Sequence, residues 1–415
     1  MNIIRISVLS LFLVVTSCKG TGQLGQHAGG STEQLRKDIS YLASDALEGR
    51  ETGKPGAQLA ATYIATRMAE LKLAPMGDEG TYFQEFAMPQ FDPHNPHSTT
   101  SVVRGSNVIG FMDHGAEHTI VIGAHYDHLG YGGFGSLYIG AEPAIHNGAD
   151  DNASGVAGLL YLAEVCKKQF RGNNFLFIAF AGEERGLLGS NYFVKNATTD
   201  LSSVNFMLNM DMIGRLKAEK SLAVYGVGTS PEWKPVLEAL QIDSIQMVPT
   251  ESGVGPSDHT SFYHEGIPVL HFFTGQHEDY HKPSDDTDKI NFAGMQSVLK
   301  YIEAVLQALD DDAKLVFQET QDSTQSMRTD FKVTLGVMPD YLYSGKGMRI
   351  DGVRPDRPAA KAGILKGDIV LRMSDLEVID MMSYMEALGT FVPGQTIKVL
   401  IEHEGVQLEK EVTFD

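Results

Sequence analysis

Cysteine, basic residues and long apolar runs are scarce in this 415-residue sequence. With two cysteines, Cys18 and Cys166, the chain has no disulfide framework, and a chain of this length can bury a large core without one. Lysine and arginine total 33 against 53 aspartates and glutamates, which gives a formal net charge of −20. The basic face that binds phosphates is therefore lacking, so we expect no nucleic acid partner and attribute the acidity to solubility.

The apolar stretch Ile6 to Val15 is too short to span a bilayer. It follows a basic start and precedes Val-Thr-Ser-Cys, which resembles a bacterial lipoprotein box ending at Cys18. We expect residues 1–18 to be a lipoprotein signal peptide and the mature protein to be exported, anchored to the membrane through Cys18, and facing the periplasm or the cell exterior. The alternative is an ordinary signal peptide that happens to contain a cysteine. Residues 19–32 are expected to be a flexible tether.

Strand-like apolar runs alternate with helical patterns through most of the remaining chain. Helices are predicted at 34–47, 58–71, 156–170 and 295–309, and strands at 120–122, 175–180, 206–210, 222–227 and 268–273. This alternation predicts an α/β domain over residues 33–312, with helices on both faces of a sheet. A polar linker at 313–327 and a small β-rich domain at 328–415 are expected to follow. Cys166, on an apolar helix face, is expected to be buried.

Carboxylates and imidazoles follow several of the predicted strands, where α/β sheets bind their ligands. These residues are His125 and Asp127 in GAHYDHLG, Glu183 and Glu184 in GEE, Asp211 in NMDMIG, and His277 and His281 in HEDYH, while Asp150 and Asp151 in NGADDNASG precede the helix predicted at 156–170. Imidazole with carboxylate suits zinc. Five candidate ligands, His125, Asp151, Glu184, Asp211 and His281, are too many for one tetrahedral catalytic ion, so two Zn²⁺ ions sharing a water are expected. The adjacent acids can then divide the work, one binding metal and the other taking the proton of the water.

The motifs GAHYDHLG, NGADDNASG, AFAGEERGLLGS, NMDMIGR and DYHKPSDDTD, in this order, resemble the M28 zinc peptidases, which are di-zinc exopeptidases and mostly aminopeptidases. The resemblance covers about Glu33 to Leu309 and implies a mixed sheet of the zinc-exopeptidase type. It implies terminal ligands at His125, Glu184, Asp211 and His281, and a bridging carboxylate at Asp151. It further implies that Glu183 is the general base and that Asp127 orients a ligand histidine.

Several neighbouring residues allow more than one interpretation. Asp150 is read as a surface acid or a helix cap, and His128 as a residue packed under the site in preference to a ligand. His277 competes with His281, and the following PSDDTD favours His281. Asp258, in PSDHTSF, is expected to have a structural role behind the ligands.

The C-terminal stretch from LGVMPDY through RPDRPAAKAGILKGD resembles a PDZ domain of the type attached to bacterial proteases. Leu335, Gly336, Val337 and Met338 correspond to the loop that binds a peptide carboxylate in such domains. A peptide C-terminus or a protein partner would add a strand to the exposed sheet edge. The alternative is a packing module without a ligand.

Together these patterns predict a zinc aminopeptidase that acts on peptides with a free N-terminus. A carboxypeptidase, a dipeptidase and a glutaminyl-cyclase-like enzyme on the same fold are alternatives. So is a peptide-binding protein without catalysis, although the full set of ligands and the base argues against it.

Overall fold

The computed structural model describes residues 31–92, 95–133, 135–310, 313–320, 332–340, 343, 345–354, 357–379 and 381–415. The expected signal peptide, its Cys18 and nearly all of the expected tether lie outside the described residues. Within the described ranges, no helix is both long enough and apolar enough to cross a membrane.

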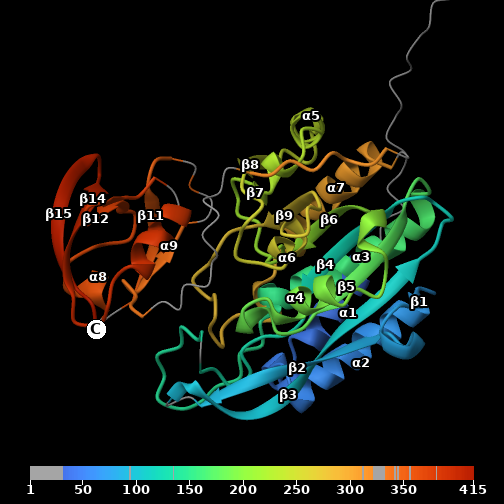
Figure 1. Ribbon diagram of the computed structural model, residues 1–415, viewed down its shortest axis with the longest axis horizontal. Helices are drawn as coiled ribbons and strands as arrows, with labels where there is room; N and C mark the ends of the chain where they lie inside the picture. Colours follow the sequence, from blue (N-terminus) through green and yellow to red (C-terminus); the bar gives the residue numbers. More distant parts are fainter. Residues whose placement is uncertain are drawn as a thin grey trace, which may run out of the picture.

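The larger domain is built on a nine-stranded sheet in the order β1-β3-β5-β4-β6-β9-β7-β8, with β2 paired to β3 (Figure 1). The strands are β1 (Ala74–Pro75), β2 (Phe83–Asp92), β3 (Asn95–Met112), β4 (Thr119–His125), β5 (Asn174–Phe180), β6 (Val204–Met210), β7 (Ser221–Tyr225), β8 (Gln246–Thr250) and β9 (Val269–Phe273). The central strands β5, β4, β6 and β9 are parallel. Antiparallel β3 and β7 flank them, which confirms the expected mixed sheet.

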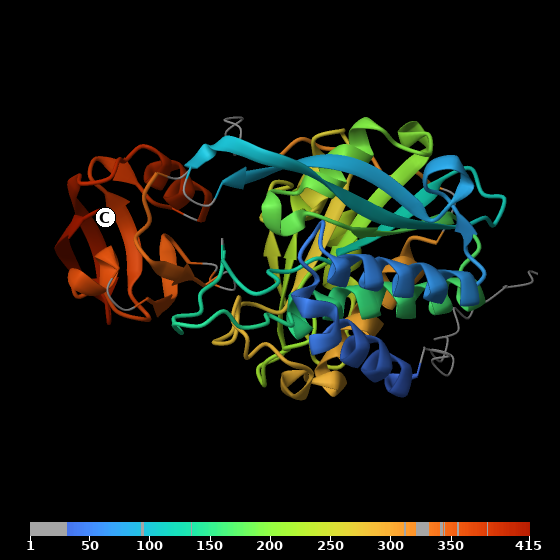
Figure 2. The same ribbon diagram turned by 90° about the horizontal axis from the view of Figure 1, so that it is seen from below.

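Helices cover both faces of this sheet, as the sequence predicts (Figure 2). They are α1 (Thr32–Leu42), α2 (Pro55–Glu70), α3 (Gly155–Gln169), α4 (Leu188–Lys195), α5 (Trp233–Ala239), α6 (His259–Tyr263) and α7 (Phe292–Ala308). Alternate residues of β4 face opposite sides: Ile120 and Ile122 join the core under α1, α2, α3 and α7, whereas Val121 joins the core under α4 and α6. Because both sides are covered, every residue of β4, β5 and β6 is buried, and so is Cys166 of α3.

The smaller domain, which is red in Figure 1, has a six-stranded antiparallel sheet in the order β10-β11-β12-β14-β15, with β13 paired to β12. Its elements are β10 (Val337–Pro339), β11 (Met348–Val353), α8 (Pro358–Lys361), β12 (Ile369–Met373), β13 (Leu376–Glu377), α9 (Met381–Gly389), β14 (Thr396–His403) and β15 (Val406–Thr413). It has a hydrophobic core of its own. The expected peptide-binding loop includes Gly336, which has a φ of +74° and lies too close to Arg357 for a side chain.

Residues 313–320, expected to begin the linker, lie against the larger domain. Asn205, in β6, donates from its side chain to the Ala313 carbonyl (3.0 Å) and accepts from the Leu315 amide (2.8 Å). Leu315 is buried in the main core, and the Phe317 ring lies 5.6 Å from the Tyr263 ring. This segment therefore belongs structurally to the larger domain, although it forms neither helix nor strand.

A shortened protein that ends at Asp310 should be less stable than one that ends at Thr320. Burial of the Leu315 side chain contributes about 2 kcal/mol to the free energy of unfolding. Denaturant unfolding of the two shortened proteins measures the difference. Equal unfolding midpoints would show that residues 313–320 do not stabilise the domain.

Candidate metal centre

Ends of the parallel strands bring the expected ligands together. His125 is the last residue of β4, Glu183 and Glu184 follow β5, and Asp211 directly follows β6. Because β5, β4, β6 and β9 run in the same direction, their C-terminal ends share one edge of the sheet. His281 follows β9, and Asp151 comes from an irregular helical turn, Ala149–Ser154, that leads into α3. All five expected ligands therefore meet at this edge, together with the expected base Glu183.

Asp151 stands between two sets of donor atoms. Its Oδ1 lies 3.4 Å from His125 Nε2, and its Oδ2 lies 3.1 Å from His281 Nε2. On the first side, Asp211 Oδ1 is 3.3 Å from His125 Nε2. On the second side, Glu184 Oε2 is 3.3 Å from His281 Nε2. The two carboxylate oxygens of Asp151 thus face two different imidazole–carboxylate pairs.

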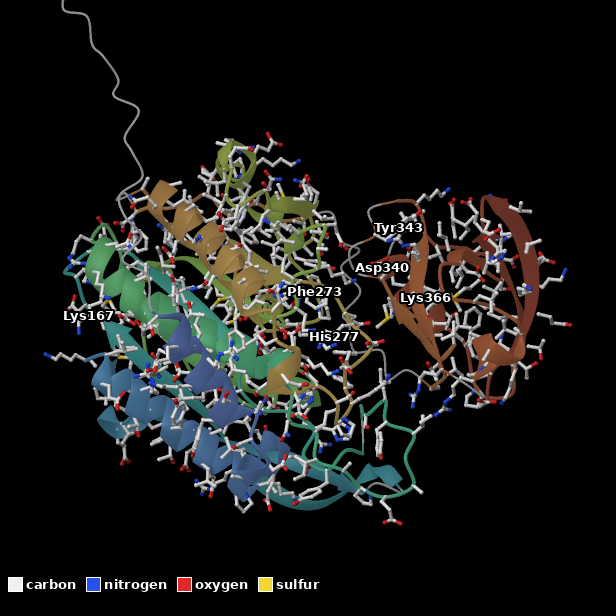
Figure 3. All side chains as sticks on the ribbon, turned by 180° about the vertical axis from the view of Figure 1, so that it is seen from behind. Lys167, Phe273, His277, Asp340, Tyr343 and Lys366 are labelled. Atoms are coloured by element: carbon white, nitrogen blue, oxygen red, sulfur yellow. The ribbon has the colours of Figure 1, made fainter. Side chains whose placement is uncertain are left out.

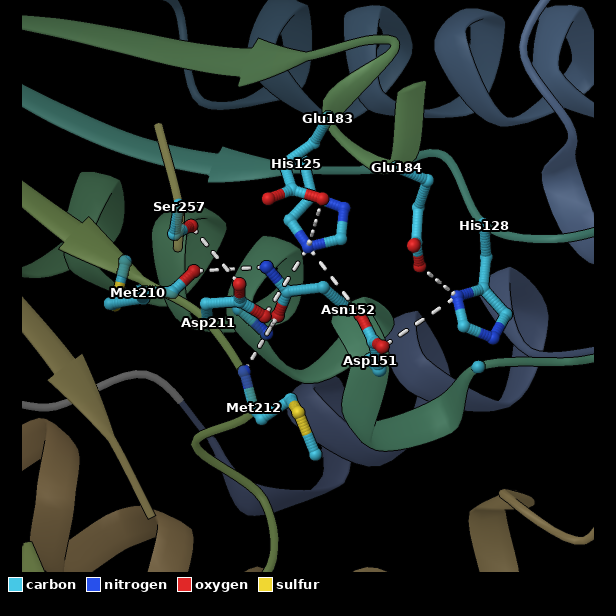
Figure 4. Close-up of polar contacts among 12 residues, drawn as sticks. His125, His128, Asp151, Asn152, Glu183, Glu184, Met210, Asp211, Met212 and Ser257 are labelled. Atoms are coloured by element: carbon cyan, nitrogen blue, oxygen red, sulfur yellow. Dashed lines mark hydrogen bonds and ion pairs between the residues drawn. The ribbon is translucent and has the colours of Figure 1, made fainter. Parts of the chain in front are cut away.

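His128 was expected to pack under the site, but it lies within hydrogen-bonding distance of an expected ligand, Glu184. Its Nδ1 lies 2.7 Å from Glu184 Oε1 and 3.9 Å from Asp151 Oδ2 (Figure 4). Potential ligand atoms within 4.8 Å of one another occur in two groups of the described residues, His125 with Glu183 and Asp211, and His128 with Asp151 and Glu184. His128 therefore either orients Glu184 or supplements His281 as a ligand.

The electrostatics of this edge match a site for divalent cations. Burial raises the pKa of Glu183 well above its usual value, and the nearby Glu184 and Asp211 raise it further. Burial also disfavours charge on Glu184, but His281 and His128 hold the pKa of that carboxyl well below its usual range. Buried acids so close together need compensating positive charge, and imidazole with carboxylate is a donor set that suits zinc. The residues present therefore fit the expected metal.

Asp127 acts differently from the expected carboxylate–histidine pair. Its backbone carbonyl oxygen is 3.2 Å from His125 Nδ1, whereas its carboxylate Oδ1 is 3.8 Å away from that nitrogen. The carboxylate instead accepts a hydrogen bond from the Glu183 amide (3.1 Å). Asp127 thus orients the ring through its main chain and holds the expected base through its side chain.

Asp150 is fully buried, so the surface interpretation is wrong. Its Oδ1 accepts hydrogen bonds from the Gly214 amide (2.6 Å) and the Ser154 hydroxyl (3.0 Å). Its Oδ2 lies 3.2 Å from His277 Nε2. His277 therefore faces Asp150, and of the two competing histidines it is His281 that faces the ligand carboxylates.

Asp285 and Asn152 hold the turn that carries Asp151, and neither was singled out from the sequence. The Asp285 carboxylate accepts from the amides of Asp150 (3.0 Å) and Asp151 (3.1 Å). The Asn152 side chain donates to the Met210 carbonyl (3.0 Å) and accepts from the Met212 amide (3.2 Å), as Figure 4 shows. The residues on either side of Asp211 are thereby tied to the Asp151 turn.

Arg50 is a buried cation near the acidic residues of the site, and it was not singled out from the sequence. Its guanidinium donates to the carbonyl oxygens of Tyr126 (2.8 Å), Asn147 (2.6 Å) and Gly148 (3.0 Å). Burial lowers its pKa to about 10, against the opposing effect of nearby carboxylates, of which Asp151 has the largest influence. The guanidinium therefore stays charged at neutral pH and offsets part of the negative charge of the site.

Ser257 connects the site to the buried layer behind it. Its hydroxyl donates to Asp211 Oδ2 (3.0 Å) and accepts from the Asn209 side chain (2.9 Å). Asp258, for which a structural role was expected, is buried directly before α6, and burial raises its pKa to about 7. Its role stays a prediction.

A pocket opens beside the ligands. Its lining includes the expected ligands Asp151, Glu184, Asp211 and His281, the expected base Glu183, and the residues Met212, Pro256, His271, Phe273, Gln276 and Tyr280. Figure 3 shows Phe273 and His277 at the end of the domain where the parallel strands finish. The pocket thus joins an acidic floor to a partly apolar wall.

Comparison with known proteins identifies both domains. Residues 107–306 match the model of peptidase family M28, and residues 321–414 match the PDZ domain model. Over residues 107–306 the larger domain is therefore similar to peptidase family M28. The aminopeptidase YwaD of Bacillus subtilis is 34% identical over 166 residues, which are 36% of this chain and 35% of that protein. The chain spans between a third and two thirds of the length of such curated relatives, for example 50% of a probable leucine aminopeptidase of Arthroderma otae.

Solved structures share the fold of the M28 domain. A zinc aminopeptidase from Bacillus subtilis superposes with a TM-score of 0.54 at 19% identity, over 70% of this chain and 99% of that one. A glutaminyl cyclase from Bacteroides thetaiotaomicron superposes with a TM-score of 0.53 at 16% identity, over 66% of this chain and 97% of that one. Peptidases and cyclases are therefore both built on this fold.

Replacing Arg50 with methionine should destabilise the protein by about 3 kcal/mol or more. The substitution removes a buried cation and leaves several buried carbonyls without their donor. The matched control is Arg185→Met, which breaks a half-exposed ion pair with Glu51 and should cost less than about 1 kcal/mol. Denaturant unfolding of the two variants tests this, and equal losses would contradict a central role for Arg50.

Proposed function

We propose that this protein is a zinc-dependent M28 aminopeptidase with two metal ions. The observation that carries the proposal is the position of Asp151, whose two oxygens face two separate imidazole–carboxylate pairs. A carboxylate in this position suits a bridge between two ions. His125 and Asp211 would hold one ion, and His281 and Glu184 the other. When bound, zinc would polarise the scissile carbonyl and make a water molecule more acidic.

Glu183 is the proposed general base. It lines the pocket beside the His125–Asp211 pair, and its Oε2 is 4.0 Å from His125 Nε2. Glu183 accepts the proton of the attacking water and then donates it to the nitrogen of the leaving amine. Asp127 fixes the main chain of Glu183, so the carboxylate is positioned before the substrate binds.

The pocket also supports an exopeptidase that starts at the amino end. The free α-amino group of a peptide is a cation and would be drawn to the acidic floor. Its first side chain would then lie against Met212, Pro256, Phe273 and Tyr280. This wall favours an apolar first residue such as leucine.

The PDZ domain would add a second contact with peptides or a protein partner. β10 ends the strand order of its sheet and is paired along one edge with β11. A peptide C-terminus would add a strand at the other edge, with its carboxylate at Leu335–Met338. We further propose export and anchoring through a lipid on Cys18, which the sequence pattern alone supports.

A glutaminyl-cyclase-like activity is the second candidate, because the cyclase fold is equally similar. Such an enzyme should hold one zinc ion per chain. The two-sided position of Asp151 favours two ions and hence the aminopeptidase. Metal analysis of the purified protein separates the two candidates.

Glu183→Gln should retain both zinc ions and lose turnover by about 10²-fold or more, because the amide cannot take the proton. The matched control is Asp151→Asn, which should lose metal as well as activity. Metal analysis and peptide hydrolysis distinguish the two variants. Normal activity of Glu183→Gln would rule out its role as the base.

A leucine-initiated peptide should lose residues stepwise only when its N-terminus is free. Acetylation removes the positive charge that the acidic floor would hold. Mass analysis of the free and acetylated forms, each incubated with zinc-loaded protein, measures this. Cleavage of both forms would point to a carboxypeptidase or an endopeptidase, and cleavage of neither would favour the cyclase or the binding protein.

A further inference from the structure

The pocket has one wall that depends on a short glycine-containing loop, residues 251–256. Pro256 lines the pocket, and Gly253 and Gly255 precede it. Within the loop, the Ser252 hydroxyl donates to the Val254 carbonyl (2.7 Å) and accepts from the Val254 amide (3.0 Å). Glycine gives the rest of the loop conformational freedom, which contacts from outside the loop restrict. Contacts that hold this loop therefore also hold the pocket wall.

Two contacts fix the ends of the loop. At its start, the Glu251 carbonyl accepts from the Gly228 amide (2.9 Å). At its end, the Thr260 hydroxyl accepts from the Gly255 amide (2.8 Å) and donates to the Gly255 carbonyl (2.7 Å). The middle of the loop lies between these two points.

The middle is held by Thr320, which belongs to the segment after α7. Its Oγ1 accepts from the Gly253 amide (3.2 Å) and shares a hydrogen bond with the Tyr263 hydroxyl (2.9 Å). The Thr320 amide also donates to the Tyr263 hydroxyl (2.9 Å). Gly253 packs so closely on the Tyr263 ring that an added Cβ would lie 2.1 Å from Cδ2. Loop, ring and segment thus form one interlocked contact.

The segment itself is secured along its length. Asn205 holds Ala313 and Leu315 at the start, and the Gln318 amide donates to the Thr229 carbonyl (2.8 Å). Figure 1 shows this orange segment returning from the end of α7 across the domain. Thr320 is therefore a fixed point against which the loop can be held.

We propose that Thr320 and Tyr263 are positioning residues that determine how the pocket selects the first side chain of the substrate. They hold the loop at Gly253, and together with Thr260, which holds Gly255, they fix Pro256 in the pocket wall. The selectivity part of this inference rests on the proposed aminopeptidase function. The holding of the loop does not, because it follows from the contacts alone.

The test uses the full-length, zinc-loaded protein and Thr320→Val, which keeps the shape of the side chain and removes its hydroxyl. For a leucine substrate, KM should rise about 3- to 10-fold with kcat within about twofold, the size expected from losing the hydrogen bond that holds the loop at Gly253. Selectivity for leucine over glycine should fall in parallel. Tyr263→Phe should behave similarly, and Thr320→Ser should restore the wild-type values.

Hydrogen exchange of residues 251–256 is measured on the same proteins, with and without zinc. Exchange should be faster in Thr320→Val and Tyr263→Phe than in the wild type. Tyr82→Phe is the matched control, because it removes a hydroxyl that donates to the Leu73 carbonyl, and neither residue lines the pocket.

Unchanged exchange in Thr320→Val would overturn the proposed clamp. Faster exchange with unchanged KM and selectivity would overturn the specificity role. If Tyr82→Phe changed exchange, KM and selectivity as much as Thr320→Val does, the effect would be general destabilisation, and the proposal would also be overturned. If the wild type hydrolyses no peptide, the proposed function fails, while the exchange experiment still decides whether Thr320 holds the loop.

Discussion

A carboxylate can face two cations only if its two oxygens point to separate groups of donors, and Asp151 is held in that position from several directions. Asp285 binds the amide of Asp151, and Arg50 binds the Gly148 carbonyl just before the turn. The side chain of Asn152, the residue after Asp151, donates to the carbonyl of Met210 at the end of β6. The N-terminal helices, the central sheet and the segment after β9 therefore together hold Asp151 in position.

The same arrangement explains how the fold tolerates so many buried acids. Desolvation disfavours the charged form of the Glu183 carboxyl, because burial raises its pKa. The imidazoles and the guanidinium of Arg50 supply part of the opposing charge, but they are shared among several carboxylates. Bound zinc would supply the remaining positive charge, so we expect the metal affinity and the stability of this edge to be linked.

The sequence predicted those elements that are buried on all sides along their whole length. Buried strands such as β5 are continuous apolar runs. The polar residues that directly follow these runs mark the strand ends at which the expected ligands meet. The role of Arg50 was not predictable, because LEGRETG shows no apolar pattern and most of the carbonyls that Arg50 binds are distant in the sequence, such as those of Tyr126 and Gly148, 76 and 98 positions away. The hairpin β2–β3 was missed since it carries polar residues and Pro89 and lies towards the sheet edge.

The segment ending at Thr320 was missed for a related reason: the short apolar run Leu315-Val316-Phe317 among polar residues gives no recognisable period. The burial of Leu315 and Phe317 depends on partners in β6 and α6. Because the PDZ domain follows this segment in the chain, the covalent route from that domain to the pocket passes through Thr320. Along this route, a ligand of the PDZ domain changes the pocket only if its affinity differs between two states of the protein. In one state Thr320 is bound to Gly253, and in the other this contact is broken.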